Sequence, residues 1–243
     1  MSGLQKVAVV VGVGPGTGAA VARRFAREGF KTALLSRRLE SLTPVQQEIQ
    51  KAGGQAISVP CDCAKLEDIA SAFERIRAEL GTPSVLVYNA GPAGMSWPPP
   101  GILDIEPGAW QKSLDTGVSG GLYCAQQVLP KMVEAGQGTI IFTGATAALR
   151  GSKKFALLSV PKFALRGLSQ TIAREFQPQG IHCCHVIVDG IIEAPRTKAM
   201  LPDRPSDEML SADSIADVYW SLHMQHRSTW TQEIDIRPFT EKW

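Results

Sequence analysis

A glycine-rich segment near the N-terminus has the spacing of a phosphate-binding loop. Its glycines directly follow the apolar run Val7–Val11 and precede a helical pattern of apolar residues. Glycine lets a backbone approach a pyrophosphate closely, and the N-terminus of the next helix offers free N–H groups and a partial positive charge. An ordinary tight turn is the alternative. The segment predicts a dinucleotide site at Gly12, Gly14, Gly16, Thr17 and Gly18.

A second candidate position lies at the end of the next apolar run, where Ser36, Arg37 and Arg38 follow one another. NAD-specific sites place a carboxylate here to bind the ribose hydroxyls. A carboxylate would repel a 2′-phosphate, whereas an arginine fork can pair with it. These residues therefore favour NADP(H) over NAD(H), unless both arginines only contact solvent at the start of the following helix.

Strand and helix patterns alternate along the whole chain, and they must position these residues. Apolar runs predict strands over 7–11, 32–36, 56–59, 85–88, 139–142, 182–188 and 233–236. Helical patterns cover 16–28, 39–52, 66–80, a long stretch from after Pro107 to Met132, 154–176 and 214–224, whereas 189–209 is irregular. We expect an α/β fold, a single Rossmann-like doubly wound domain over residues 1–243. It should have about seven mostly parallel strands with helices on both faces, and ligands should bind beyond the carboxyl ends of the strands.

The motif Tyr88-Asn89-Ala90-Gly91 follows the fourth predicted strand. With the glycine spacing Gly-x-x-x-Gly-x-Gly, it resembles the short-chain dehydrogenase/reductase family, and the resemblance extends over essentially all of the chain. It implies that the Asn-Ala-Gly segment shapes the floor of a cofactor site and that Asp62 contacts the adenine. The cofactor contacts implied after the glycine loop and the arginines are Asp62, Cys63, Asn89, Ala90, Gly91, Lys162, Gly190 and Ile192.

The family's proton chemistry uses a tyrosine, a lysine four residues later, a serine and an asparagine. Lys162 matches the lysine. The tyrosine, serine and asparagine positions then fall on Leu158, Ala145 and Gly117, which have no phenol, hydroxyl or amide. After the sixth predicted strand, the family's Pro-Gly is replaced by Asp189-Gly190, and Ala194 stands at the family's threonine position.

A shift in the alignment cannot restore the tyrosine, because the chain's three tyrosines are Tyr88, Tyr123 and Tyr219. A general acid typically contributes about 10²–10⁴ in rate, so its loss matters. The retained Lys162 fits the family's other use of this lysine, which is to hold the nicotinamide ribose. Thr146, one residue after the serine position, is the first candidate for a substitute proton donor, and a loop-capping hydroxyl is the alternative. Further candidates are Ser96, Thr143, Lys153, Lys154 and Ser159.

Composition excludes several classes of protein. The 243 residues carry a net charge of +2, from 25 Lys and Arg against 23 Asp and Glu, so we expect no nucleic-acid partner. Five cysteines without a C-x-x-C pair favour a reducing, cytoplasmic setting. In His182-Cys183-Cys184-His185, neighbours on a strand face opposite sides, so we expect no metal site. No apolar run reaches the roughly 18 residues of a membrane span.

Three functions remain open from the sequence. The first is an NADP(H)-binding oxidoreductase that acts on a carbonyl or alcohol in a small-molecule substrate and has a non-standard proton donor. The second is a catalytically inactive NADP(H)-binding pseudoenzyme or assembly protein. The third is a non-redox cyclase, isomerase or lyase on the same scaffold. The family resemblance also implies a homodimer or homotetramer. Introducing Leu158→Tyr, Ala145→Ser and Gly117→Asn together should raise carbonyl reduction if the scaffold is otherwise intact.

Overall fold

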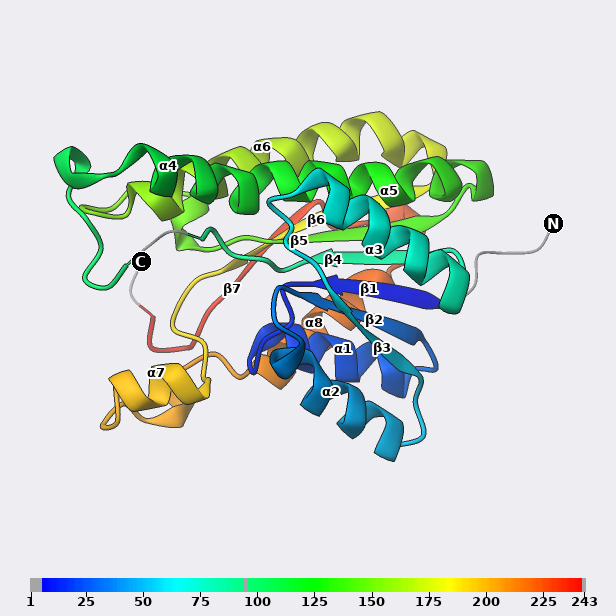
Figure 1. Cartoon of the computed structure of the whole chain (residues 1–243), viewed down its shortest axis with the longest axis horizontal. Helices are drawn as coiled ribbons and strands as arrows, with labels where there is room; N and C mark the ends of the chain where they lie inside the picture. The colour runs from blue at the N-terminus through cyan, green and yellow to red at the C-terminus, as the bar shows by residue number, and fades with distance from the viewer. Residues whose placement is uncertain (1–5, 94–95, 242–243) are drawn as a thin grey trace.

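The computed structural model describes residues 6–93 and 96–241. Their strands form one sheet of seven strands in the order β3-β2-β1-β4-β5-β6-β7, and every neighbouring pair is parallel (Figure 1). The strands are β1 Val7–Val11, β2 Lys31–Ser36, β3 Ala56–Pro60, β4 Val85–Tyr88, β5 Gly138–Thr143, β6 Ile181–Val188 and β7 Glu233–Ile236. The predicted Rossmann-like α/β fold is confirmed, and the sheet is parallel throughout.

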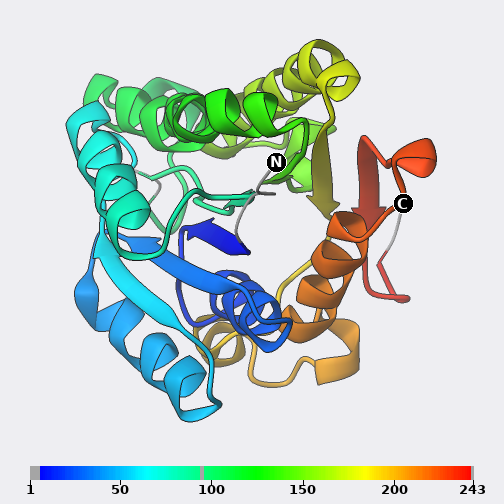
Figure 2. The same ribbon diagram turned by 90° about the vertical axis from the view of Figure 1, so that its right-hand side faces the viewer.

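Helices cover both faces of the sheet (Figures 1 and 2). On one face lie α1 Thr17–Arg27, α2 Leu39–Lys51 and α8 Ala212–His223, which share a hydrophobic core with one side of the strands. On the other face lie α3 Leu66–Glu79, α4 Pro107–Leu114, α5 Gly120–Ala135 and α6 Ala156–Phe176. Every residue of β1 and of β6 is buried, which explains their unbroken apolar runs.

Two segments differ from the sequence-based expectation. The long helix ending near Met132 is divided, because a π-helical stretch, Asp115–Ser119, joins α4 to α5. The expectation of an irregular segment over 189–209 is wrong at α7 Pro195–Met200. There the Thr197 hydroxyl accepts a hydrogen bond from the Ala194 amide at 2.9 Å and donates to the Ile192 carbonyl oxygen at 2.6 Å, so a local capping arrangement starts a short helix.

Within the described ranges, no helix combines the length and the apolar character that a membrane crossing would require.

Candidate functional site

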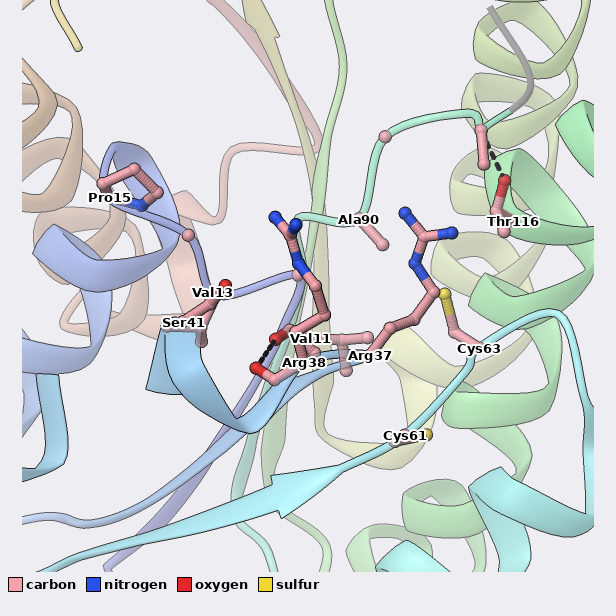
Figure 3. A pocket seen from close by; sticks show the side chains of 15 residues that line it. Val11, Val13, Pro15, Arg37, Arg38, Ser41, Cys61, Cys63, Ala90 and Thr116 are labelled. Atoms are coloured by element: carbon pink, nitrogen blue, oxygen red, sulfur yellow. Dashed lines mark hydrogen bonds between the residues drawn. The ribbon is translucent and has the colours of Figure 1, made fainter. Parts of the chain in front are cut away.

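A cavity of about 240 Å³ opens beyond the carboxyl ends of β1, β2 and β4 (Figure 3). It gathers segments from the first half of the chain, as expected for a ligand site of a doubly wound sheet. The lining residues that the sequence predicted are Gly12, Gly14, Ser36, Arg37, Arg38, Cys63, Ala90 and Gly91. The lining residues that it did not predict are Val11, Val13, Pro15, Ser41, Cys61, Ala93 and Thr116.

The glycine loop is pressed against the end of β4. Gly12 has a φ of +87°, and a Cβ there would lie 2.6 Å from the backbone of Ala90. A Cβ at Gly18 would lie 2.5 Å from the Gly12 carbonyl oxygen, which already accepts a 2.9 Å hydrogen bond from the Asn89 side chain. Gly14 differs, because nothing lies within 4 Å of its would-be Cβ. Gly12 and Gly18 are thus needed for the close packing of the loop, whereas the space beside Gly14 is open.

Thr17 provides an independent test of whether this loop fits a dinucleotide. It stands in the first turn of α1 and is only 6% exposed. Its hydroxyl oxygen is buried and has no hydrogen-bond partner among the described residues. A buried polar group left unpaired costs about 1–3 kcal/mol. A phosphate oxygen at the helix N-terminus would satisfy this hydroxyl, so the residues present fit a dinucleotide.

The far end of the cavity is cationic. Both Arg37 and Arg38 follow the end of β2 and line the cavity, and their side chains extend toward the loop that carries Ala90 (Figure 3). Within the described part of the chain, neither forms an ion pair with a carboxylate. Ser36 donates a 3.1 Å hydrogen bond to the Arg38 carbonyl oxygen, and Ser41 adds a hydroxyl from the first turn of α2. Unpaired guanidinium groups beside hydroxyls form a suitable environment for a phosphate.

Lys162 lies outside this lining, on α6. It is 5% exposed, and its Nζ donates a 2.5 Å hydrogen bond to the carbonyl oxygen of Thr143 at the end of β5. Burial lowers the pKa of Lys162 to about 8. The ammonium group therefore sits at the carboxyl edge of the sheet, at the end of β5.

The buried lysine should make stability depend on pH. At pH values between about 8, the pKa of Lys162 in the folded chain, and about 10.4, the ordinary pKa of lysine, Lys162 binds fewer protons in the folded chain than in the unfolded chain. The free energy of unfolding of the wild type should therefore rise with pH in this window. Relative to a Lys162→Met variant, the rise should be about 1–3 kcal/mol. Urea unfolding of both proteins at pH 7.5, 8.5 and 9.5 measures this difference. If the two proteins differ in free energy of unfolding by the same amount at all three pH values, the prediction is wrong.

Proline rings occupy the place where the family would carry its asparagine. Gly117 lies in the π-helical stretch, and a Cβ on it would lie 2.5 Å from the Cβ of Pro161 and 3.3 Å from the Cγ of Pro92. Pro161 belongs to α6, one residue before Lys162. Leu158 is half-buried on the first turn of the same helix. At Gly117, therefore, apolar proline atoms take the space that an asparagine side chain would need.

Most candidate hydroxyls are already engaged elsewhere. Thr146, in the short turn after β5, donates a hydrogen bond to Oδ1 of Asp189. Thr143 pairs with the Tyr219 hydroxyl at 2.8 Å, and Ser159 donates a 2.8 Å hydrogen bond to the carbonyl oxygen of Phe155, the residue just before α6. The other candidates, Ser96, Lys153 and Lys154, are exposed.

The tyrosines do not replace the missing phenol. Tyr88 is fully buried and donates a 2.7 Å hydrogen bond to the Thr116 carbonyl oxygen, and burial raises its pKa well above the usual value. Tyr219 is fully buried too, and Tyr123 packs half-buried against the core. None of the three lines the cavity.

Some predicted cofactor residues lie beside the cavity rather than in its lining. The Asp62 carboxylate accepts a 3.2 Å hydrogen bond from the Ala64 amide, in the turn before α3. Gly16 faces Ala194, whose Cβ would be 3.7 Å from a Cβ on that glycine, so the segment after β6 lies next to the glycine loop. Gly190 has a φ of +146° in that segment, and Ile192 forms a β-bridge with Leu210.

Sequence reasoning missed three residues that now matter. Ser41 could have been recognised from its place in the first turn of the predicted helix over 39–52, three residues after Arg38. Asp189 stands at a position where the family has proline, and the sequence does not reveal its bond to Thr146. Pro161 gave no signal, because its contact with Gly117 joins two different helical segments.

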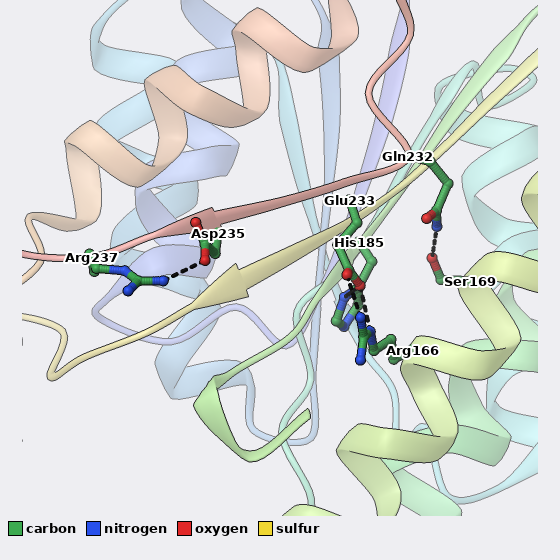
Figure 4. Close-up of polar contacts among 7 residues, drawn as sticks. All are labelled: Arg166, Ser169, His185, Gln232, Glu233, Asp235 and Arg237. Carbon is green, nitrogen blue, oxygen red and sulfur yellow. Dashed lines mark hydrogen bonds and ion pairs between the residues drawn. The ribbon is translucent and has the colours of Figure 1, made fainter. Parts of the chain in front are cut away.

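A polar cluster of Arg166, His185 and Glu233 joins α6 to the sheet (Figure 4). Arg166, one turn after Lys162 on α6, donates two hydrogen bonds of 2.7 and 2.6 Å to the Glu233 carboxylate on β7. The same carboxylate lies 3.0 Å from Nδ1 of the fully buried His185 on β6. The cluster ties α6 to β6 and β7. Over the described residues, no group of three or more His, Cys, Asp or Glu side chains is placed to hold a metal ion.

Comparisons with known proteins agree with this architecture. A family model described as short chain dehydrogenase matches residues 6–205. An uncharacterized oxidoreductase of Staphylococcus aureus strain USA300 is 27% identical over 235 residues, covering 96% of this chain and 97% of its own. A crystal structure of a short-chain dehydrogenase from Rhodopseudomonas palustris is 31% identical, with a TM-score of 0.81 over 96% of this chain and 98% of that one. A metagenomic short-chain oxidoreductase in complex with NADP is 27% identical, with a TM-score of 0.82 over 99% of this chain and 100% of that one.

Proposed function

Because the chain belongs to the short-chain dehydrogenase/reductase family, we propose that it is an NADP(H)-dependent oxidoreductase that interconverts an alcohol and a carbonyl in a small molecule. The observation that carries the choice of cofactor is the pair of guanidinium groups, Arg37 and Arg38, that reach into the cavity beside the glycine loop without a carboxylate partner in the described chain. A relative of known structure binds NADP, which supports the same choice.

The proposal assigns a task to each part of the site. The glycine loop and the Thr17 hydroxyl would hold the pyrophosphate, because backbone N–H groups at a helix N-terminus favour anions. Arg37, Arg38 and Ser41 would bind the 2′-phosphate. Lys162 would hold the nicotinamide ribose. When bound, the cofactor supplies hydride exchange, and the chain must supply orientation and a route for one proton.

A second candidate function is supported by a different observation. Leu158, Ala145 and Gly117 stand where the family's proton-transfer groups are expected, and proline rings fill the space at Gly117. These features suit a protein that binds NADP(H) without catalysing a reaction.

Ligand titration and a substrate screen separate the two candidates. We expect NADPH to bind at least tenfold more tightly than NADH, because only NADPH carries the phosphate that the arginines would pair with. Nicotinamide fluorescence gives both dissociation constants, and absorbance at the nicotinamide band then follows turnover across a panel of alcohols and carbonyls. A preference for NADH would reject the proposed cofactor. Tight NADPH binding with no turnover on the whole panel would favour the non-catalytic candidate.

A further inference from the structure

Asp189 is a buried carboxylate that the family's usual chemistry does not use. It directly follows β6, is 5% exposed, and its amide donates a 2.8 Å hydrogen bond to the carbonyl oxygen of Ile236 at the end of β7. Its Oδ1 accepts the hydrogen bond from Thr146, and Nη2 of Arg237 lies 3.6 Å from its Oδ2. A carboxylate removed from water is retained when such partners stabilise its charge.

The bond to Asp189 decides what the Thr146 hydroxyl can do. A hydroxyl has one proton to donate and two lone pairs to accept with. Because the Thr146 proton is directed to Asp189, the hydroxyl cannot at the same time donate to a substrate carbonyl. Its remaining lone pair can accept a hydrogen bond from a substrate hydroxyl. The arrangement therefore suits removal of a proton from an alcohol.

We infer that Thr146 and Asp189 form a proton-accepting pair for alcohol oxidation at the carboxyl ends of β5 and β6. The inference rests on the proposed NADP(H)-dependent function. Oxidation of an alcohol releases a hydride, which the bound NADP⁺ of that function accepts, and one proton. The substrate O–H proton passes to Oγ1 of Thr146 as the Thr146 proton passes to Oδ1 of Asp189, which later releases it to solvent. Thr146 would touch the substrate, and Asp189 acts through it.

Charged groups around the pair agree with this role. Arg237 lies next to Asp189 and also pairs with Asp235 (Figure 4), so a cation from the segment after β7 borders the Asp189 carboxylate. Lys162 donates to the Thr143 carbonyl oxygen at the start of the same turn. Glu241 approaches Gly190 from the C-terminal segment, with its Oε2 3.4 Å from a would-be Cβ.

Three variants and a matched control test the pair: Asp189→Asn, Thr146→Val, the double variant, and Asp207→Asn on the exposed turn after α7. For the alcohol that the wild type oxidises fastest, kcat/KM at pH 7 should fall at least tenfold in each single variant. In the double variant, kcat/KM should fall no further, because the losses from groups that act as a unit do not add. For the wild type and for Asp207→Asn, kcat/KM for alcohol oxidation should rise with pH in the acidic range. The Asp189→Asn variant should lose this dependence on pH. Additive losses, or an unchanged pH profile in Asp189→Asn, would overturn the inference.

Two readouts that need no turnover separate this inference from the proposed function. The dissociation constant of NADPH should be the same in all variants. The infrared difference spectrum of wild type minus Asp189→Asn, recorded without cofactor, should contain carboxylate bands that shift in the Thr146→Val background. Bands that do not shift would show that the hydrogen bond is absent and would overturn the pair. Failure of the wild type to bind NADPH would instead reject the proposed function.

Discussion

Replacing Arg37 and Arg38 together by alanine is expected to weaken NADPH binding by about 10²–10⁴-fold and to change NADH binding by less than about threefold. Both guanidinium groups reach into the cavity, and the described chain gives neither a carboxylate partner, so their charges are available to a phosphate. A hydrogen bond to a charged group contributes about 1.5–3 kcal/mol, and about 1.4 kcal/mol corresponds to a tenfold change in affinity. Fluorescence titrations at one fixed ionic strength measure both dissociation constants.

Matched variants make this expectation specific. Arg150→Ala removes an exposed arginine outside the cavity lining and should leave both affinities unchanged. Changing both cavity arginines to lysine should give an intermediate loss, because an ammonium lacks the planar fork. Ser36→Asp should weaken NADPH binding by repulsion and favour NADH. Equal losses for the two cofactors would indicate damage to the glycine loop, and no loss would show that the arginines only contact solvent.

The parts of the fold that rest on local patterns could be predicted from the sequence. The glycine loop follows a strand that is buried on both faces, so its apolar run and its glycines are both visible in the chain. The order in which the strands pair, and the fully parallel sheet, depend on contacts between distant segments. The short helix α7 was missed because it depends on the Thr197 side chain bonding to nearby backbone groups rather than on a run of apolar residues.

In the candidate site too, some residues could be predicted from local patterns, whereas others depend on contacts between distant segments. The arginines at the end of β2 could be placed because they immediately follow a predicted strand. The bond between Thr146 and Asp189 spans 43 residues and joins the ends of two adjacent strands, so only the folded sheet reveals it. Knowing this partner turns Thr146 from a candidate proton donor into a proposed acceptor.

Gly117→Asn should be strongly destabilising, although it would return the family's asparagine. A Cβ at this position would lie 2.5 Å from the Cβ of Pro161. Overpacking costs about 1–3 kcal/mol and a buried, unpaired amide a further 1–3 kcal/mol, so we expect the free energy of unfolding to fall by about 3–5 kcal/mol. Urea unfolding measures the loss, and Gly167→Asn is the matched control, because nothing lies within 4 Å of its would-be Cβ on α6.

Adding Pro161→Gly to Gly117→Asn should recover part of this loss, because it removes the Pro161 Cβ that would lie 2.5 Å from the new Cβ, which alanine would keep. The two changes should therefore be non-additive by at least about 1 kcal/mol, as expected for residues in contact. A Gly117→Asn protein as stable as Gly167→Asn would show that the proline ring yields readily. If the coupling is found, the substitutions at Leu158, Ala145 and Gly117 cannot restore the family's proton chemistry without a fourth change at Pro161. The glycine at 117 and the proline at 161 would then be one structural unit, which would explain why the asparagine cannot be returned by itself.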